Sequence, residues 1–276
     1  MTTIRPPAVA GSFYPDDPAI LSAVVEDFLA EVPGPPDDGP PGDGPLHDHW
    51  PKAVIAPHAG YIYSGPVAAS AYARLKRAAG RVRRVVVIGP SHYAAFPGIA
   101  APASEAFETP LGRVPVDAAA IAEIRDLPQV TVADGPHIQE HSLEVQLPFL
   151  QAVLGDFAVV PLAIGEAGPA QTAEVLARLW GGAETAIVVS TDLSHYNAHE
   201  VARRLDAATA AAIEAYQAER LGPGDACGYQ ALAGLLVEAR ARGLAIERLD
   251  LRNSGETGGH MREVVGYGAW ALCEAV

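Results

Sequence analysis

Three histidines each follow an apolar run with the length and composition of a buried strand. His58 follows residues 53–56, His92 follows residues 84–88, and His195 follows residues 185–189. If these strands are parallel, their carboxyl ends lie at one edge of the sheet, where α/β proteins bind ligands. Imidazole binds metals and transfers protons near neutral pH. The pattern therefore predicts one shared site at this edge.

Carboxylates and a further histidine accompany these residues. Asp192 lies in the same loop as His195 and is placed to orient it as a general acid or base. Glu140 and His141 lie in a segment predicted as a helix over 138–154, and we expect both to face the same crevice. The sequence thus predicts His195, Asp192 and His141 as catalytic residues.

The residue types alone do not decide which third ligand would join His58 and His92 on a metal. A carboxylate from Asp192, Glu140 or Glu256 would complete the two-histidine, one-carboxylate arrangement that suits Fe(II). Cys227, near the start of a predicted helix, would instead make a softer site that also suits copper or zinc. A free cysteine is also often simply a small buried residue, as we expect for Cys273 in the last strand.

Residues 137–141 spell H-x-x-E-H, the pattern of one group of zinc peptidases. That chemistry requires His137 and His141 on one helix face, with Glu140 as the general base. Pro136 directly precedes the motif, so His137 can lie ahead of the helix. A zinc hydrolase therefore remains an alternative function.

Alternating strands and helices must position these side chains. Helices are predicted over 19–31, from Pro66 onward, and over 117–126, 138–154, 169–180, 198–220 and about 227–242, with further strands over 130–132, 157–164, 245–251 and 263–273. Such alternation is typical of an α/β fold with a central, mainly parallel sheet flanked by helices, and the two final strands indicate a mixed sheet. We expect one domain over residues 1–276, with a flexible Pro-, Gly- and Asp-rich loop at 33–51.

Charge and composition exclude several classes of partner. The 276 residues carry 19 basic and 33 acidic side chains, a net charge of −14, which argues against nucleic acid and anionic membrane surfaces. No apolar run approaches the roughly 18 residues of a membrane span, and the first residues lack a signal-peptide core. With two cysteines no disulfide framework is expected, and a cytoplasmic location is predicted.

Several segments taken together resemble the Memo family, whose bacterial and archaeal members are called AmmeMemoRadiSam system protein B. The matching segments, in chain order, are VAGSFYP, APHAGYIYSG, GPSHY, ETPLG, EHSLEVQLPFL, STDLSHY, CGYQA and NSGE followed by VVGYGA. The resemblance implies a fold like that of the class III extradiol dioxygenases, which use non-haem iron. It also implies metal ligands at the positions of His58, His92 and Cys227.

Three possible functions remain, two implied by the resemblance and one by the H-x-x-E-H pattern. The first is a redox protein related to the dioxygenases, with Fe(II) as the expected metal, copper or zinc as alternatives, and an unknown small-molecule substrate. The second is a non-catalytic metal-binding partner of radical SAM and AMMECR-type proteins. The chain has no CxxxCxxC motif and is therefore not itself the radical enzyme. The third is the zinc hydrolase.

Overall fold

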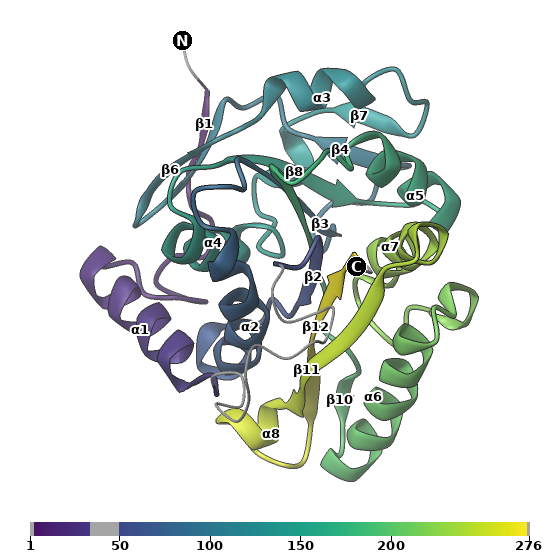
Figure 1. Cartoon of the computed structure of the whole chain (residues 1–276). Helices are drawn as coiled ribbons and strands as arrows, with labels where there is room; N and C mark the ends of the chain where they lie inside the picture. The colour runs from purple at the N-terminus through teal and green to yellow at the C-terminus, as the bar shows by residue number, and fades with distance from the viewer. Residues whose placement is uncertain (1–2, 34–49, 275–276) are drawn as a thin grey trace, which may run out of the picture.

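Four parallel strands form the centre of the main sheet in the computed structural model of the chain (Figure 1). They lie in the order β2 (Ala53–Ala56), β9 (Thr185–Ser190), β3 (Arg84–Pro90) and β8 (Ala158–Ile164). Nearly every residue of these strands is buried, as their continuous apolar runs predict for strands covered on both faces. The three strands predicted to lead to His58, His92 and His195 are thus adjacent and parallel, so their carboxyl ends share one edge, although His195 itself lies in a further short strand.

Antiparallel pairing extends this centre on both sides. β12 (Val264–Cys273) runs antiparallel to β2 and also pairs with β10 (His195–Asn197) and β11 (Ala245–Asn253). On the other side β4 (Ile99–Ala101) runs antiparallel to β8, and β7 (Val130–Val132) runs parallel to β4. Among the described residues the main sheet therefore has nine strands and is mixed, as predicted.

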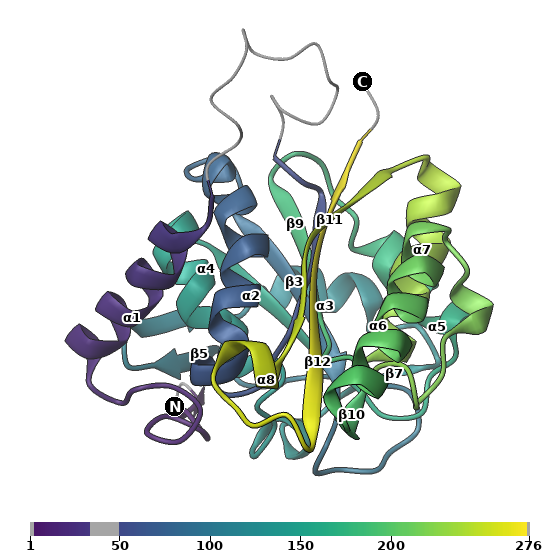
Figure 2. The same cartoon turned by 90° about the horizontal axis from the view of Figure 1, so that it is seen from below.

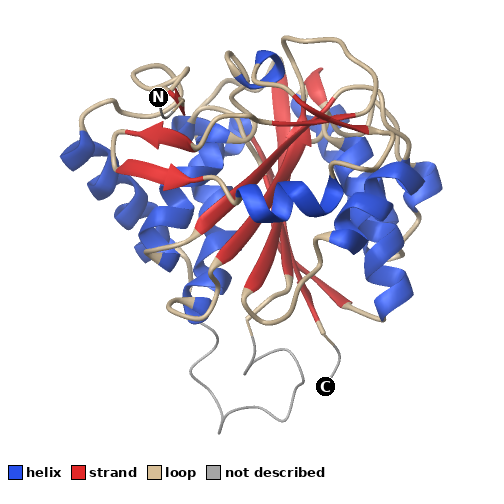
Figure 3. Cartoon of the chain, turned by 90° about the horizontal axis from the view of Figure 1, so that it is seen from above, coloured by secondary structure: helices blue, strands red, loops and turns tan. Residues whose placement is uncertain are grey.

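Helices cover both faces of the main sheet, as Figures 2 and 3 show. One face packs on α1 (Pro18–Glu31), α2 (Tyr61–Leu75) and α4 (Leu147–Leu154), and the other on α3 (Ala118–Ile124), α5 (Pro169–Arg178), α6 (His199–Glu214) and α7 (Tyr229–Arg242). Successive residues of β3 serve opposite faces: Val85 and Val87 join the first core, and Val86 and Ile88 the second. This is the predicted α/β architecture.

The shorter elements lie at the ends of these layers. They are the turns of 3-10 helix η1 (Lys76–Ala78), η2 (Gly135–His137), η3 (Glu144–Gln146) and η4 (Ala218–Arg220), and the four-residue helix α8 (Ser254–Thr257). A second, three-stranded sheet joins β1 (Ile4–Arg5), β5 (Ala106–Thr109) and β6 (Gly112–Pro115). It brings the start of the chain beside the segment that precedes α4.

The structure corrects several predicted boundaries. α2 begins at Tyr61 rather than at Pro66, which lies inside the helix. The helix predicted over 138–154 is α-helical only from Leu147, because the side chains of Glu140 and Glu144 are bonded to distant groups instead of facing a helix exterior. α6 ends at Glu214 rather than near residue 220, and the short strand β10 was not predicted.

The structure describes residues 3–33 and 50–274. The predicted loop at 33–51 therefore lies, from residue 34 to residue 49, outside the described residues. No helix in the described part of the chain has the length and apolar character needed to cross a membrane.

Candidate metal centre

His58 and His92 meet at the carboxyl edge of the parallel strands. His58 lies two residues beyond β2 and His92 two residues beyond β3, and their ring centroids are 5.2 Å apart. His58 is buried, whereas the side chain of His92 is 29% exposed. The pair lies where the strand order predicted a ligand site.

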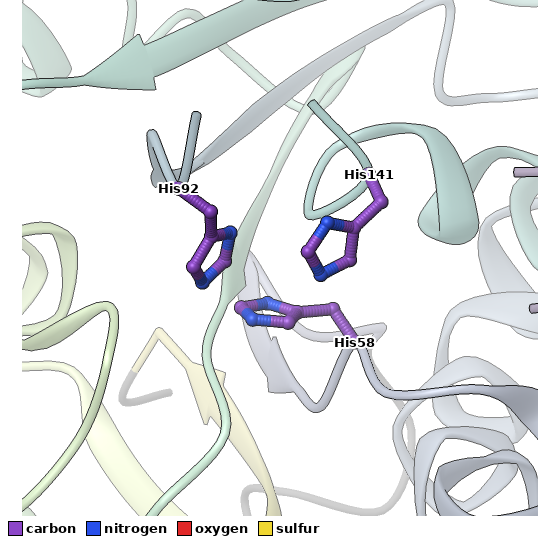
Figure 4. Close-up of side chains that lie close together, drawn as sticks. All are labelled: His58, His92 and His141. Atoms are coloured by element: carbon purple, nitrogen blue, oxygen red, sulfur yellow. The ribbon is translucent and has the colours of Figure 1, made fainter. Parts of the chain in front are cut away.

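His141 completes a group of three imidazoles, which Figure 4 shows facing one another. Its ring centroid is 4.6 Å from that of His92 and 5.5 Å from that of His58. Each residue offers one ring nitrogen, and these three nitrogens all lie within 4.8 Å of one another. His141, predicted for proton transfer, is thus also placed as a possible metal ligand. The ring of Phe13, 4.6 Å away, covers it on another side.

Cys227 lies against this group although it is 169 residues from His58 in the chain. Its Sγ is 3.2 Å from His58 Nε2. The end of β9 holds it there, because the Asp192 N–H donates to Sγ (3.3 Å) and the Cys227 N–H donates to the Asp192 carbonyl (3.2 Å). Gly228 permits this approach, since a Cβ there would lie 2.7 Å from the Ser190 carbonyl oxygen. Of the predicted trio, His58 thus lies beside both His92 and Cys227. The nitrogens that group within 4.8 Å are those of His58, His92 and His141, and the Cys227 thiol is not part of that group.

The ionisation of the group fits a metal site. Burial, with the charges of neighbouring histidines, lowers the pKa of His58 well below its usual value, and burial lowers that of His141 to about 4. Both rings are therefore neutral at pH 7, with a nitrogen lone pair free for a ligand. Burial and the charge of Asp192 raise the pKa of Cys227 to about 12. The thiol is therefore protonated at neutral pH, although Cys227 lies just ahead of a helix, and a cation bound there would displace its hydrogen.

Glu140 orients His92. Its Oε1 lies 2.9 Å from His92 Nδ1, and its Oε2 accepts from the His92 N–H at 2.5 Å. Burial disfavours the charged carboxylate, but hydrogen bonds from His92 and Ser142 lower the pKa of Glu140 to about 2. An ionised carboxylate can only accept, so the hydrogen of His92 lies on Nδ1 and Nε2 is free. Glu140 thus supports a ligand and is not one of the three grouped donors.

Asp192 and His195 both follow β9 in the chain but have different surroundings. Asp192 is buried, which raises its pKa, and its Oδ1 accepts from the His58 N–H at 2.7 Å. His195 is exposed on β10, paired with Val265. Within the described residues no hydrogen bond joins them. Asp192 therefore orients the His58 loop.

The other candidates from the sequence lie elsewhere. His137 belongs to the 3-10 turn η2 rather than to a helix shared with His141, and its Nε2 bonds to the Ala100 carbonyl at 3.1 Å. The arrangement expected of the H-x-x-E-H motif is therefore not formed. Glu256 bonds to the Asn253 N–H and caps α8.

A buried ion pair behind the site was not predicted. Arg5 pairs with Glu144 and donates from Nη2 to the Glu140 carbonyl (2.6 Å) and from Nε to the His137 carbonyl (2.9 Å). Glu144 also accepts from the Tyr14 hydroxyl. The start of the chain thus fixes the segment that carries Glu140 and His141. No local pattern signals this pair, because its members are 139 residues apart.

The chain has an α/β fold, with imidazoles and a thiol at the carboxyl edge of its parallel strands. These features make it a candidate metalloprotein. The sequence model described as Memo-like protein matches residues 5–271, and the chain belongs to the Memo family.

Curated relatives match over nearly their whole length. MEMO1 family proteins of Thermotoga neapolitana and Methanothermobacter thermautotrophicus are 36% and 35% identical, and each alignment covers 96% of this chain and 98% of the relative. A relative from Methanopyrus kandleri is 36% identical.

Among solved structures, the crystal structure of an uncharacterized protein from Escherichia coli K12 is similar to this fold. It has a TM-score of 0.50 and 14% identity, and covers 81% of this chain and all of that one. At this identity the likeness concerns the fold alone.

Proposed function

We propose that this chain is a metal-dependent redox protein that takes Fe(II) or copper at the edge of its parallel strands. The main support is that ring nitrogens of His58, His92 and His141 lie within 4.8 Å of one another. The Cys227 thiol lies 3.2 Å from the nitrogen of His58. Two buried neutral rings and a displaceable thiol hydrogen suit a divalent or soft cation. A redox-active metal, when bound, supplies the electron transfer that these side chains do not.

The residues divide into ligands and supporting groups. His58 and His92 would hold the metal through Nε2, with Cys227 as the anionic ligand. Because the pKa of Cys227 is raised to about 12, ligation at neutral pH releases one proton from the thiol. A site with a thiolate ligand favours copper more than a site with only nitrogen and oxygen ligands does.

Two histidines would move protons for a small-molecule substrate of unknown identity. His141 shares the group and is shielded by Phe13, so it would act on a proton inside the site. His195 is exposed and would exchange that proton with solvent. Asp192, which bonds to the main chain of His58, keeps the first ligand loop in place.

The test is metal analysis of the whole chain purified anaerobically, after separate loading with Fe(II), Cu(I) and Zn(II). We expect about equimolar iron or copper in the wild type and a large loss in His58→Ala, while His260→Ala, an exposed histidine, keeps wild-type content. Equal metal content in wild type and His58→Ala would contradict the proposal.

Two other outcomes would point to the alternatives. Zinc binding together with peptidase activity would favour the hydrolase. A stable metal without turnover would favour a binding role beside radical SAM and AMMECR-type proteins.

A further inference from the structure

Ser190 ends β9 directly beneath the candidate metal centre. It is fully buried. Its Oγ lies 2.6 Å from the Ser142 carbonyl oxygen, 2.7 Å from Gln146 Nε2 and 2.9 Å from His58 Nδ1. One hydroxyl thus has three polar neighbours, but it has only one hydrogen to donate.

The neighbours decide where that hydrogen goes. A carbonyl oxygen can only accept, so the Ser190 hydroxyl donates to Ser142. Gln146 is also fixed, because its Oε1 accepts from the Tyr72 hydroxyl at 2.5 Å and its Nε2 donates to the Pro57 carbonyl at 3.0 Å. The same Nε2 therefore donates to Ser190. Ser190 can then only accept from His58, so the hydrogen of His58 must lie on Nδ1.

We propose that Ser190 is a positioning residue that holds His58 in the Nδ1–H tautomer, with Nε2 bare. The bare nitrogen is the one that lies 3.2 Å from Cys227 Sγ. Ser190 thereby acts on His58 as Glu140 acts on His92, with a neutral acceptor in place of a carboxylate. The inference rests on the proposed function only in taking that bare nitrogen as the metal ligand.

His141 provides an internal contrast. Its Nδ1 is buried and makes no hydrogen bond in the part of the chain that the structure describes, although Glu140 Oε1 lies 3.6 Å away. That oxygen already bonds to His92 Nδ1 and accepts from the Ser142 N–H, so no hydrogen bond to Nδ1 holds His141 in one tautomer. The group of three thus consists of two rings oriented by hydrogen bonds at Nδ1 and one ring that is not, which suits His141 to proton transfer.

Ser142 extends the same support to the next loop. Its Oγ donates to the Pro90 carbonyl at 2.8 Å, two residues before His92. Gly89 leaves room for both serines, since a Cβ there would lie 3.1 Å from Ser190 Cβ and 3.2 Å from Ser142 Oγ. The two serines thus join the loops of His58, His92 and His141, and of the two it is Ser190 that hydrogen-bonds to an imidazole.

The test compares Ser190→Ala with Ser142→Ala in the full chain. Nitrogen-15 spectra of the metal-free protein, labelled in histidine, report which ring nitrogen of His58 carries the hydrogen. Zn(II) affinity is measured separately by competition with a chelating dye. We expect Nδ1–H in the wild type and in Ser142→Ala, and a mixed or Nε2–H ring in Ser190→Ala. Zn(II) affinity should fall by about 10- to 100-fold in Ser190→Ala, the usual effect of losing a residue that orients a ligand.

A wild-type His58 that carries its hydrogen on Nε2 overturns the inference, and this measurement needs no variant to fold. A Ser190→Ala protein with an unchanged tautomer and unchanged Zn(II) affinity also overturns it. If the wild type holds the Nδ1–H tautomer but binds no metal, the proposed function fails while the role of Ser190 in orienting His58 stands.

Discussion

Cys227 Sγ lies 3.2 Å from Nε2 of His58, on the side of the imidazole that faces away from Ser190. The contact joins the loop after β2 to the residues that precede α7. Neither residue is charged at pH 7, because burial lowers the pKa of His58 and, together with Asp192, raises that of Cys227. The contact therefore joins a protonated thiol to a nitrogen without hydrogen. In the proposed function both atoms would bind the same cation.

Cys227→Ser should remove most of the metal affinity, because a neutral hydroxyl is a poor substitute for a thiolate. Alkylation of the wild type, mapped by mass spectrometry, should be slow at pH 8 without metal and should accelerate as the pH rises toward 12. Bound metal should protect the thiol further. Cys273, fully buried in β12, is the control and should stay unmodified. Fast alkylation at pH 7 that ignores metal would contradict the assignment.

His195→Ala should leave metal content near that of the wild type and abolish any redox turnover, because His195 is exposed and outside the group of three. His58→Ala should lose both. Metal content by mass spectrometry and oxygen consumption with candidate substrates separate the two effects. A metal loss in His195→Ala equal to that in His58→Ala would make His195 a ligand instead.

Arg5→Met should destabilise the protein by about 3–5 kcal/mol, because it leaves the Glu144 carboxylate buried without its cation. Denaturant unfolding of the metal-free chain measures this. Arg113→Gln breaks the exposed pair with Glu108 and should cost no more than about 1 kcal/mol. Metal affinity should also fall in Arg5→Met, since Arg5 holds the Glu140 carbonyl. Similar costs for the two variants would show that the buried pair does not fix this segment.

Stability should decline as the pH falls from about 6.5 toward 4, partly through His137. Burial and the charge of Arg5 lower the pKa of His137 to about 4, whereas the unfolded chain takes up this proton near pH 6.5. The unfolded state therefore binds more protons in this window, and acidification favours it. His137→Gln should reduce the slope by up to about 1.4 kcal/mol per pH unit. His260→Gln, at an exposed position, should leave the slope unchanged.

The sequence by itself determined the parallel centre and the place of the site. Apolar runs at β2, β3 and β9 can be stable only when covered on both faces, and each run is followed by a segment that carries His58, by one that carries His92, or by one that carries Asp192 and His195. These are local signals, so their boundaries were predicted within one or two residues. The alternation of strands and helices then predicted the α/β fold, and the two strands that end the chain indicated that the sheet is mixed.

Only the tertiary structure decided which other side chains reach the site. The strand order places β9 between β2 and β3, and this alone brings Ser190 under His58 and beside Gly89. His141 was expected on a helix, yet it lies in a loop fixed by Arg5 and by Glu140, whose partners are far away in the chain. Hydrogen bonds between residues more than a hundred positions apart leave no periodicity in the sequence, because each depends on how separate elements pack.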